Sequence, residues 1–412
     1  MPESPQPVSA LRGATLADGS TVDVTISGGS VTAVVPSAGA AAGPGELDLR
    51  GFTLLTAPAD PHAHLDKARS WDAIKPPMGD LGLAIASWKA HTVTMTEDDI
   101  AERALAQALD MLANGTTAVR THVDILGTGD ALRGVRALVT VREQLADLMD
   151  LELVALAGPE APDAAVEAAL DAGIDAVGGA PHLAADPMAD LRRLLAIAER
   201  RGAPVDLHTD ESLDGADTLL ELARAVRGWT QNVSAGHCVR LGMMSDAELA
   251  PVVAEVVASR VGVIANPITN LYLQGWETAV GTPRGLTALR PLLDAGARVA
   301  AGADNVRDPF NPLGRGDALE TAMLLVVAGH LTIDEAYALV AEGAREVMGL
   351  SPAGPVPGAA AELLAVRASG LAEAVASAPA DRIVIHAGRV VARSELTRHV
   401  AAPAASHLEA AR

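Results

Sequence analysis

Apolar runs alternate with helical stretches through most of the chain. The stretches, such as DDIAERALAQALDMLANG, carry apolar residues at helical spacing and end at glycine, as helix C-termini often do. Strands that alternate with helices form right-handed βαβ units and a parallel sheet. Eight such units predict an α/β fold, a (β/α)8 TIM barrel over residues 58–357. The eight runs are FTLLTAPADPHAH, TTAVRTHVDI, LELVALAGPE, DAVGGAPHL, PVDLHTDE, NVSAGHC, VGVIANP and ARVAAGADN.

The two ends of the chain show a different pattern, in which polar and apolar residues alternate as in half-buried strands. The segment STVDVTISGGSVTAVVP predicts a hairpin around Gly28–Gly29, and DRIVIHAGRVVARSE predicts another that turns near Gly388. Strands of this type are expected only at the ends. We therefore predict one small β-sandwich built from residues 1–57 and 358–412.

The apolar runs end in polar or unusual residues. His62 and His64 end the first run, and residues two apart on a strand project to one face, so the pair either binds something together or is a coincidence of spacing. In a (β/α)8 barrel all strands open at their carboxyl ends onto one face, which carries the chemistry. The convergence of so many polar side chains on that face is hard to explain as packing of the core. The later runs end at His122, Gly158, His182, His208, His237, Asn266 and Asp304.

Four of these side chains suit a metal ion. Metal sites need deprotonated nitrogen or oxygen donors from several elements. Three imidazoles and a carboxylate suit Zn²⁺, Fe²⁺ or Mn²⁺ with one position open for water, whereas Mg²⁺ and Ca²⁺ prefer oxygen. We expect zinc or iron first and manganese second. The predicted ligands are His62, His64, His208 and Asp304.

Two further residues complete a hydrolytic set. A bound metal lowers the pKa of water to about 7, and the hydroxide can attack an electron-poor carbon. The reaction also needs a base, an acid for the leaving group and a donor near the developing oxyanion. Asp304 as ligand and base, Glu211 as proton shuttle and His237 as orienting donor fill these roles. The alternative for Glu211 is a loop carboxylate in water.

Six motifs resemble those of the amidohydrolase superfamily, specifically its cytosine deaminase-like branch, and also triazine-type amidohydrolases such as N-isopropylammelide amidohydrolase. They are PHAHLDK, RTHVDI, DLHTDES, GHC, ANPITNLYLQGW and GADNVRDPFNPLG. The resemblance covers nearly the whole chain, including both ends. It implies one catalytic metal, hydrolytic deamination, the four ligands named above, Glu211 as the acid/base glutamate and His237 as the histidine that contacts the attacking water.

The lysines bear on the number of metal ions. Two-metal relatives in the superfamily bridge their ions with a carbamylated lysine from the middle of the barrel. The chain has three lysines, Lys67, Lys75 and Lys89, and all precede the second predicted strand. No lysine is placed to form the bridge, so we expect one divalent ion.

Two departures from the cytosine deaminase pattern concern the substrate. The glutamine that reads the pyrimidine edge is matched by Gly158, and the aspartate that contacts the substrate amino group is matched by Asn305. Unpaired buried polar groups are costly, so such groups discriminate strongly. We therefore expect that cytosine is not the best substrate. Lys67 resembles the triazine-hydrolysing relatives, and either holds an anionic or carbonyl-rich ring or pairs with Asp66.

The remaining candidates for substrate contact are less specific. Gln274 could contact a ring amide, and Phe310 could stack on the ring, with loop packing as the alternative. His122 and His182 are expected to line the pocket floor as donors behind the metal ligands.

Net charge and cysteine content limit the classes of partner and the compartment expected for the protein. The 412 residues include 31 Lys plus Arg against 52 Asp plus Glu, a formal net charge of -21, which disfavours nucleic acid. The single cysteine, Cys238, suits a reducing compartment, and no secretory signal or membrane-spanning run is visible. We expect a cytoplasmic homo-oligomer that binds a small heterocyclic substrate and neither nucleic acid nor membrane.

The leading hypothesis is a mononuclear metal-dependent hydrolase that removes an amino or alkylamino group from a small nitrogen heterocycle. One alternative opens the ring of a cyclic amide, such as a hydantoin or lactam, with the same hydroxide. Another is a non-catalytic binding protein, which would have lost Glu211 or a metal ligand, and all are present.

Overall fold

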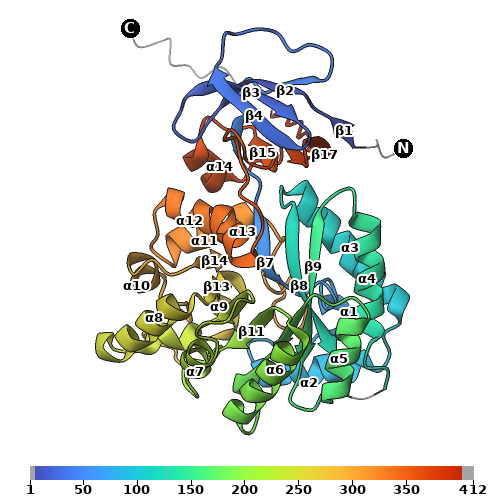
Figure 1. Ribbon diagram of the computed structural model, residues 1–412, viewed down its shortest axis with the longest axis vertical. Coiled ribbons are helices and arrows are strands. Elements are labelled where there is room, and N and C mark those ends of the chain that lie inside the picture. Colours follow the sequence, from blue (N-terminus) through green and yellow to red (C-terminus); the bar gives the residue numbers. More distant parts are fainter. Residues whose placement is uncertain (1–4, 128, 401–412) are drawn as a thin grey trace, which may run out of the picture.

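The structure, a computed structural model, describes residues 5–127 and 129–400. It consists of a barrel and a terminal sheet that lies beyond one end of the barrel (Figure 1). Residues 1–4 and 401–412 of the predicted sandwich segments lie outside the described residues. Within the described ranges, none of the helices combines the length and the apolarity that a bilayer crossing requires.

Eight parallel strands form the barrel, and each pairs with the next one along the chain. A bridge between Ala63 and Asp304 joins the first strand to the segment after the last and closes the barrel. The predicted (β/α)8 barrel is confirmed. Its strands are β7 (Ala59–Ala63), β8 (Ala118–Ile125), β9 (Asp150–Ala157), β10 (Ala176–Gly179), β11 (Val205–Thr209), β12 (Val233–His237), β13 (Gly262–Ala265) and β14 (Val299–Ala301).

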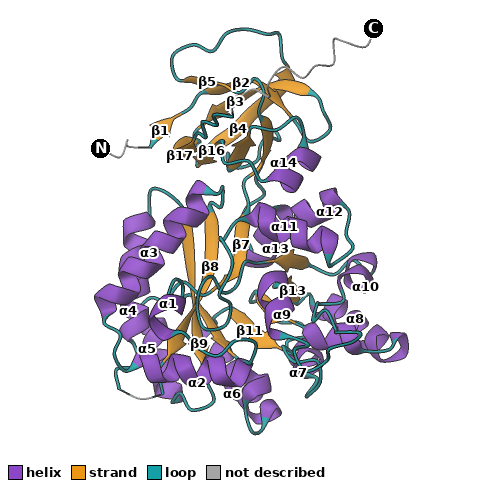
Figure 2. Ribbon diagram, turned by 180° about the vertical axis from the view of Figure 1, so that it is seen from behind, coloured by secondary structure: helices purple, strands orange, loops and turns teal. Residues whose placement is uncertain are grey.

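Helices surround the barrel, and α14 lies against the terminal sheet (Figure 2). In α6, the side chain of Asp186 accepts the N–H of Ala189 at 2.9 Å, Pro187 begins the helix, and Gly202 ends it at a φ of 61°. The helices are α1 (Trp71–Ile74), α2 (Leu81–Thr92), α3 (Glu97–Ala113), α4 (Arg133–Leu145), α5 (Asp163–Asp171), α6 (Pro187–Arg201), α7 (Thr218–Ala225), α8 (Asp246–Ser259), α9 (Pro267–Leu273), α10 (Leu289–Asp294), α11 (Ala318–Val327), α12 (Ile333–Val340), α13 (Glu342–Met348) and α14 (Leu371–Ser377).

The terminal sheet combines strands from both ends of the chain around a core that includes Leu11, Val24 and Leu363. Both predicted hairpins are confirmed, one turning at Gly28–Gly29 and one at Gly388. The domain boundaries at residues 57 and 358 stay predictions. The strands are β1 (Gln6–Pro7), β2 (Ala10–Thr15), β3 (Thr21–Ser27), β4 (Ser30–Pro36), β5 (Glu46–Asp48), β6 (Thr53–Thr56), β15 (Leu363–Val366), β16 (Arg382–His386) and β17 (Arg389–Ser394).

The apolar run at residues 52–64 divides between the two parts of the molecule. Its first half is β6, which pairs with β15 of the terminal sheet, and its second half is β7, which pairs with β8 of the barrel. Pro58 stands at the division and has no N–H to donate to a ladder. The terminal sheet therefore adjoins the amino ends of the barrel strands, and the carboxyl ends open on the opposite side.

Candidate active site

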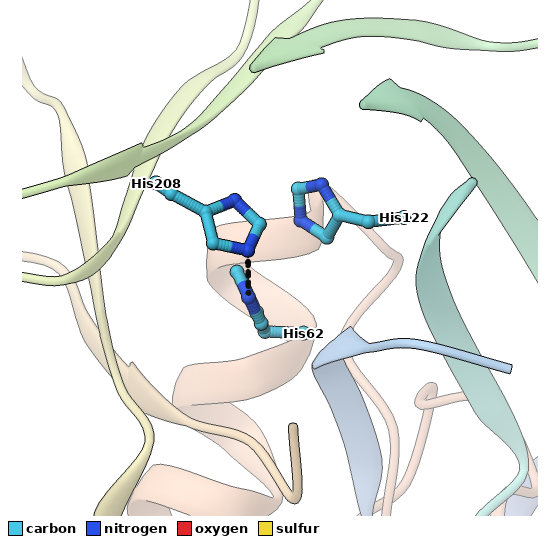
Figure 3. A group of neighbouring side chains, drawn as sticks. All are labelled: His62, His122 and His208. Atoms are coloured by element: carbon cyan, nitrogen blue, oxygen red, sulfur yellow. Dashed lines mark hydrogen bonds between the residues drawn. The ribbon is translucent and has the colours of Figure 1, made fainter. Parts of the chain in front are cut away.

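Buried imidazoles gather inside the barrel at the carboxyl ends of its strands. Figure 3 shows the rings of His62 on β7, His122 on β8 and His208 on β11 facing one another. The ring centroid of His62 is 4.3 Å from that of His122 and 4.5 Å from that of His208. The Nε2 atom of His208 lies 3.2 Å from Nε2 of His62 and 3.1 Å from Nε2 of His64. The first, second and fifth strands therefore deliver nitrogen donors to one point.

The backbone around His62 explains how its ring fits there. A Cβ atom at Gly236 of β12 would lie 2.6 Å from Cε1 of His62, so only glycine leaves room for the ring. The carboxylate of Asp60 accepts the N–H groups of His62 at 3.1 Å and Ala303 at 3.0 Å. Asp60 thereby holds β7 against the segment that carries Asp304.

Asp304 brings a carboxylate to the same point. Its N–H donates to the carbonyl of His62 at 2.9 Å, and its Oδ1 lies 3.3 Å from Nε2 of His64 and 3.8 Å from Nε2 of His62. Both carboxylate oxygens are buried and have no hydrogen-bond partner among the described residues. Asp304 and His237 adopt left-handed backbone, with φ of 58° and 70°. Such conformations are uncommon for residues other than glycine and concentrate at functional sites.

Burial favours the neutral form of three imidazoles of the cluster. Burial lowers the pKa of His62 and of His208 well below the ordinary value, and the neighbouring imidazoles lower it further. Burial and adjacent imidazoles act on the pKa of His122 in the same direction. Neutral imidazole is the form that binds a metal ion. The donor set therefore fits a metal of the kind that nitrogen and carboxylate ligands prefer.

Two groups of three residues each bring one ligand atom per residue to within 4.8 Å of one another. The first is His62, His122 and His208, and the second is His62, His237 and Asp304. His64 belongs to neither group, yet its Nε2 lies close to both His208 and Asp304. His122 lies nearest to a different carboxylate, Asp206, at 3.8 Å. The contacts of His64 therefore favour it over His122 as a member of the set.

Glu211 and His237 lie beside this point. The carboxylate of Glu211 is 3.3 Å from Nε2 of His182 and 3.7 Å from Nδ1 of His237. Burial alone would raise the pKa of Glu211, but these two imidazoles outweigh it and lower the pKa to about 2. Asn270 Oδ1 lies 3.2 Å from Nδ1 of His237 and orients that ring. Glu211 is thus a carboxylate, the form that accepts a proton.

Lys67 has carboxylate partners inside the site. Its Nζ is 2.7 Å from Asp124 Oδ1 and 3.4 Å from Asp66 Oδ2. Burial alone would lower the pKa of Lys67, but the carboxylates outweigh it and raise the pKa above its ordinary value. The indole N–H of Trp88 donates to the other oxygen of Asp124 at 2.5 Å. The predicted pairing with Asp66 is present, and the stronger partner is Asp124.

A cavity of about 440 Å³ opens onto the buried cluster. Not all of the residues predicted for the site line it. His62, Asp304, His122 and His182 lie behind its wall, and Gln274 lies outside it, with its amide donating to the backbone carbonyl of Glu211 at 2.7 Å. The predicted residues on the wall are His64, Lys67, Gly158, His208, Glu211, His237, Asn305 and Phe310.

Four residues that position the site were absent from the sequence prediction: Asp60, Asp124, Asn270 and Trp88. Two of them had a signal. Asp60 stands two before His62 on β7, and Asp124 stands two after His122 on β8, so each shares a face with a predicted histidine. Asn270 and Trp88 lie on helices, where no comparable spacing links them to the strand ends.

A (β/α)8 barrel with imidazoles and carboxylates at the carboxyl ends of its strands has the architecture of a barrel enzyme. The model of the Amidohydrolase family matches residues 79–392, and the chain belongs to this family. It is therefore a hydrolase of carbon–nitrogen bonds, which confirms the enzyme class expected from the sequence.

Individual relatives are similar over nearly the whole chain. A pterin deaminase of Rhizobium rhizogenes is 30% identical over 389 residues, which cover 90% of this chain and 88% of the relative. The structure of a 5-methylcytosine deaminase from Klebsiella pneumoniae, liganded with phosphonocytosine, matches with a TM-score of 0.85 and 27% identity, covering 96% of this chain and 100% of that one. An N-isopropylammelide isopropylaminohydrolase from Burkholderia multivorans matches with a TM-score of 0.79 and 30% identity, covering 93% and 98%. The predicted superfamily resemblance is confirmed.

Proposed function

We propose that the protein is a mononuclear metal-dependent hydrolase that removes an amino or alkylamino group from a small nitrogen heterocycle of the cytosine, pterin or triazine type. One observation carries the proposal. Three imidazole Nε2 atoms meet the buried carboxylate of Asp304, which has no hydrogen-bond partner among the described residues, behind and along the wall of one cavity that Glu211 and His237 also line. The names of the similar deaminases and aminohydrolases support the substrate class.

The residues that would hold the metal are His62, His64, His208 and Asp304. Their donor atoms lie 3.1 to 3.8 Å apart in the pairs that contact one another, close enough for a single ion. Three nitrogens and one oxygen favour zinc or iron. Such an ion supplies a water of lowered pKa and a positive charge near the developing oxyanion.

The remaining chemistry belongs to side chains of this chain. Glu211 accepts a proton from the attacking water and returns it to the departing amine, because it is a carboxylate at the cavity wall. His237 is held by Asn270, and its Nε2 is buried without a hydrogen-bond partner among the described residues, which leaves that atom for the substrate or water. The carboxylate of Asp304 is a second group that can accept a proton from the attacking water.

The cavity suits a flat ring. Ile85 and Trp88 of α2, Leu156 and Phe310 give it apolar walls, and about 440 Å³ lies in the range for small-molecule sites. The amide of Asn305 donates to Asp308 Oδ2 at 2.7 Å, so it is already engaged inside the protein. This engagement and the missing side chain at Gly158 support a best substrate other than cytosine.

Metal content and reaction product test the proposal directly. Elemental analysis of the purified protein should show about one equivalent of zinc, iron or manganese, and two equivalents would contradict a single-ion site. A screen of aminopyrimidines, pterins and aminotriazines should detect release of ammonia or amine with the ring intact. A new carboxylate from a hydantoin or lactam would instead identify the ring-opening reaction.

Glu211→Gln tests the role of the proton shuttle. We expect kcat to fall by ~10²–10⁴-fold while the metal is retained, because Glu211 transfers protons and is not a ligand. Glu167→Gln is the matched control, since Glu167 lies on α5 in an ion pair with Arg200 and outside the cavity. Full activity in Glu211→Gln would remove this residue from the mechanism.

A further inference from the structure

An ion pair lies at the open end of the cavity. Lys89 of α2 and Glu160, which follows β9, bind each other through Nζ and Oε1, and both line the cavity. Their side chains are 61% and 48% exposed, whereas His208 and Glu211 on the same wall are buried. The pair therefore lies on a solvent-exposed part of the cavity wall.

Two glycines make room for the carboxylate of Glu160. A Cβ atom at Gly158 would stand 3.0 Å from its Oε2, and a Cβ atom at Gly127 would stand 2.7 Å from its Cγ. Both glycines also line the cavity. The side chain of Glu160 thus packs against the backbone of Gly127 and Gly158. Its carboxylate lines the cavity beside Gly158, which has no side chain there.

The turn that presents Glu160 is held in place. The N–H of Ala161 donates to the carbonyl of Gly158 at 3.0 Å. Arg193 of α6 donates to the carbonyls of Ala161 at 3.2 Å and Gly158 at 3.4 Å. A group that is oriented before the ligand arrives loses less entropy on binding.

Stability does not explain the pair. Exposed ion pairs contribute about 0–1 kcal/mol, so this pair adds little to the free energy of folding. Two other polar groups of the wall are already engaged, because Asp124 accepts from Lys67 and Trp88 and the amide of Asn305 donates to Asp308. Glu160 and Lys89 offer the site an acceptor and a donor side by side.

We propose that Glu160 and Lys89 determine substrate specificity by binding a lactam edge of the heterocycle, with the carboxylate accepting the ring N–H and the ammonium donating to the adjacent carbonyl. The inference rests on the proposed function and deepens it. A ring N–H beside a carbonyl presents one donor and one acceptor, which a carboxylate and an ammonium match in charge and in hydrogen-bonding sense.

Glu160→Ala tests the acceptor. The probes are 5-methylcytosine and 1,5-dimethylcytosine, which differ by one methyl group on the lactam nitrogen N1, across the ring from the amino-bearing carbon. The wild-type protein should turn over the N–H form with a kcat/KM at least roughly tenfold higher, since a hydrogen bond to a charged group is lost on methylation. Glu160→Ala should bring the two values to within about twofold, mainly through KM. Undiminished discrimination in this variant would overturn the proposal.

Further variants separate recognition from general damage. Gly158→Ala should reproduce part of the loss by displacing Oε2, and Lys89→Met should raise KM for both members of a pair, because both keep the carbonyl. Glu167→Ala, from an exposed ion pair outside the cavity, should change nothing. An equal loss in Glu167→Ala would contradict a role specific to the cavity.

The test also distinguishes failure of the inference from failure of the proposed function. Absence of ammonia from every probe with the metal-loaded wild-type protein would overturn the function. Calorimetry on Glu211→Gln and on Glu211→Gln/Glu160→Ala then measures binding of the same probes without turnover. Equal Kd values for the N–H and N-methyl forms in both proteins would overturn the inference by itself.

Discussion

Two buried polar clusters lie in successive layers inside the barrel, and they differ in how completely they are bonded. Arg120 donates to Glu152 at 2.8 Å, Asp206 at 3.1 Å and Ser234 at 2.9 Å. In the adjacent layer, both oxygens of Asp304 and both nitrogens of His122 are buried without a hydrogen-bond partner among the described residues. In the first cluster each charged side chain has a charged partner, although Asp206 Oδ1 has no hydrogen-bond partner among the described residues. In the second, neither oxygen of Asp304 has one.

The sequence relation between the layers is simple. His122 stands two residues after Arg120 on β8, and His208 stands two after Asp206 on β11, so alternate inward positions of the same strands build both layers. A buried polar group without a partner costs about 1–3 kcal/mol. A protein keeps such groups where a ligand completes them. The difference in hydrogen bonding therefore distinguishes the candidate site, which contains Asp304, from the structural layer around Arg120.

The largest expected effect, on kcat/KM, comes from removing the carboxylate of Asp304. Asp304→Ala should lose the metal and lower kcat/KM by ~10⁴-fold or more, because several kcal/mol of transition-state stabilisation depend on the ion. The metal-free variant should lose no more than about 1–2 kcal/mol relative to the metal-free wild-type protein, the cost of alanine at a φ of 58°, since the Asp304 side chain has no hydrogen-bond partner among the described residues. Elemental analysis, ammonia release and urea denaturation measure the three quantities. A large loss of stability without the metal would show that Asp304 is structural.

Removing the Arg120 cation should have the opposite effect, a large loss of stability. Arg120→Met leaves the carboxylate of Asp206 buried and unpaired, and should lower the free energy of unfolding by roughly 3–5 kcal/mol. The double variant Arg120→Met/Asp206→Leu should recover part of this loss, because the buried charge of Asp206 is gone and only the partly exposed Glu152 lacks its partner. Urea denaturation measures both. Equal stability of Arg120→Met and the wild-type protein would contradict the structural role.

A smaller effect is expected at a third bonded group, the pair of Glu362 and His386 at 2.9 Å in the terminal sheet. Burial alone would raise the pKa of Glu362, but His386 outweighs it and the pKa is lowered. Burial alone would lower the pKa of His386, but Glu362 outweighs it and the pKa is raised. Stabilisation by Glu362 is lost as pH falls below 4.5, and stabilisation by His386 is lost as pH rises above 6.5 through its raised pKa.

Glu362→Gln should therefore destabilise the protein by on the order of 1 kcal/mol between pH 4.5 and 6.5, and by less at higher pH. Thermal unfolding of variant and wild-type protein across this range measures the difference. A difference that does not change with pH would show that the pair does not titrate between the folded and unfolded states.

Much of the fold followed from the sequence. Strands that are buried on both faces leave continuous apolar runs, and glycine marks the helix ends, so the barrel could be predicted from its repeat. The histidines on these strands could be expected to meet because parallel strands share one open face. Both terminal hairpins were visible in the alternation around Gly28–Gly29 and Gly388.

The sequence did not show contacts that depend on side-chain direction. Gln274 lies near the end of the seventh strand as predicted, but its amide turns to the carbonyl of Glu211. Lys67 stands next to Asp66 in the chain but lies closer to Asp124, which belongs to the neighbouring strand. The side chain of Glu160 folds back along the cavity wall to lie beside Gly158, two residues earlier in the chain. Spacing along one element predicts a shared face and leaves such pairings between elements undetermined.

The bridge between Ala63 and Asp304 gives the site an order of assembly. Asp304 N–H bonds to the carbonyl of His62, so the carboxylate arrives only when the last part of the barrel pairs with its first strand. Under the proposed function, an ion bound by all four donors would require the closed barrel, and it would in turn stabilise the contact between the first and last strands.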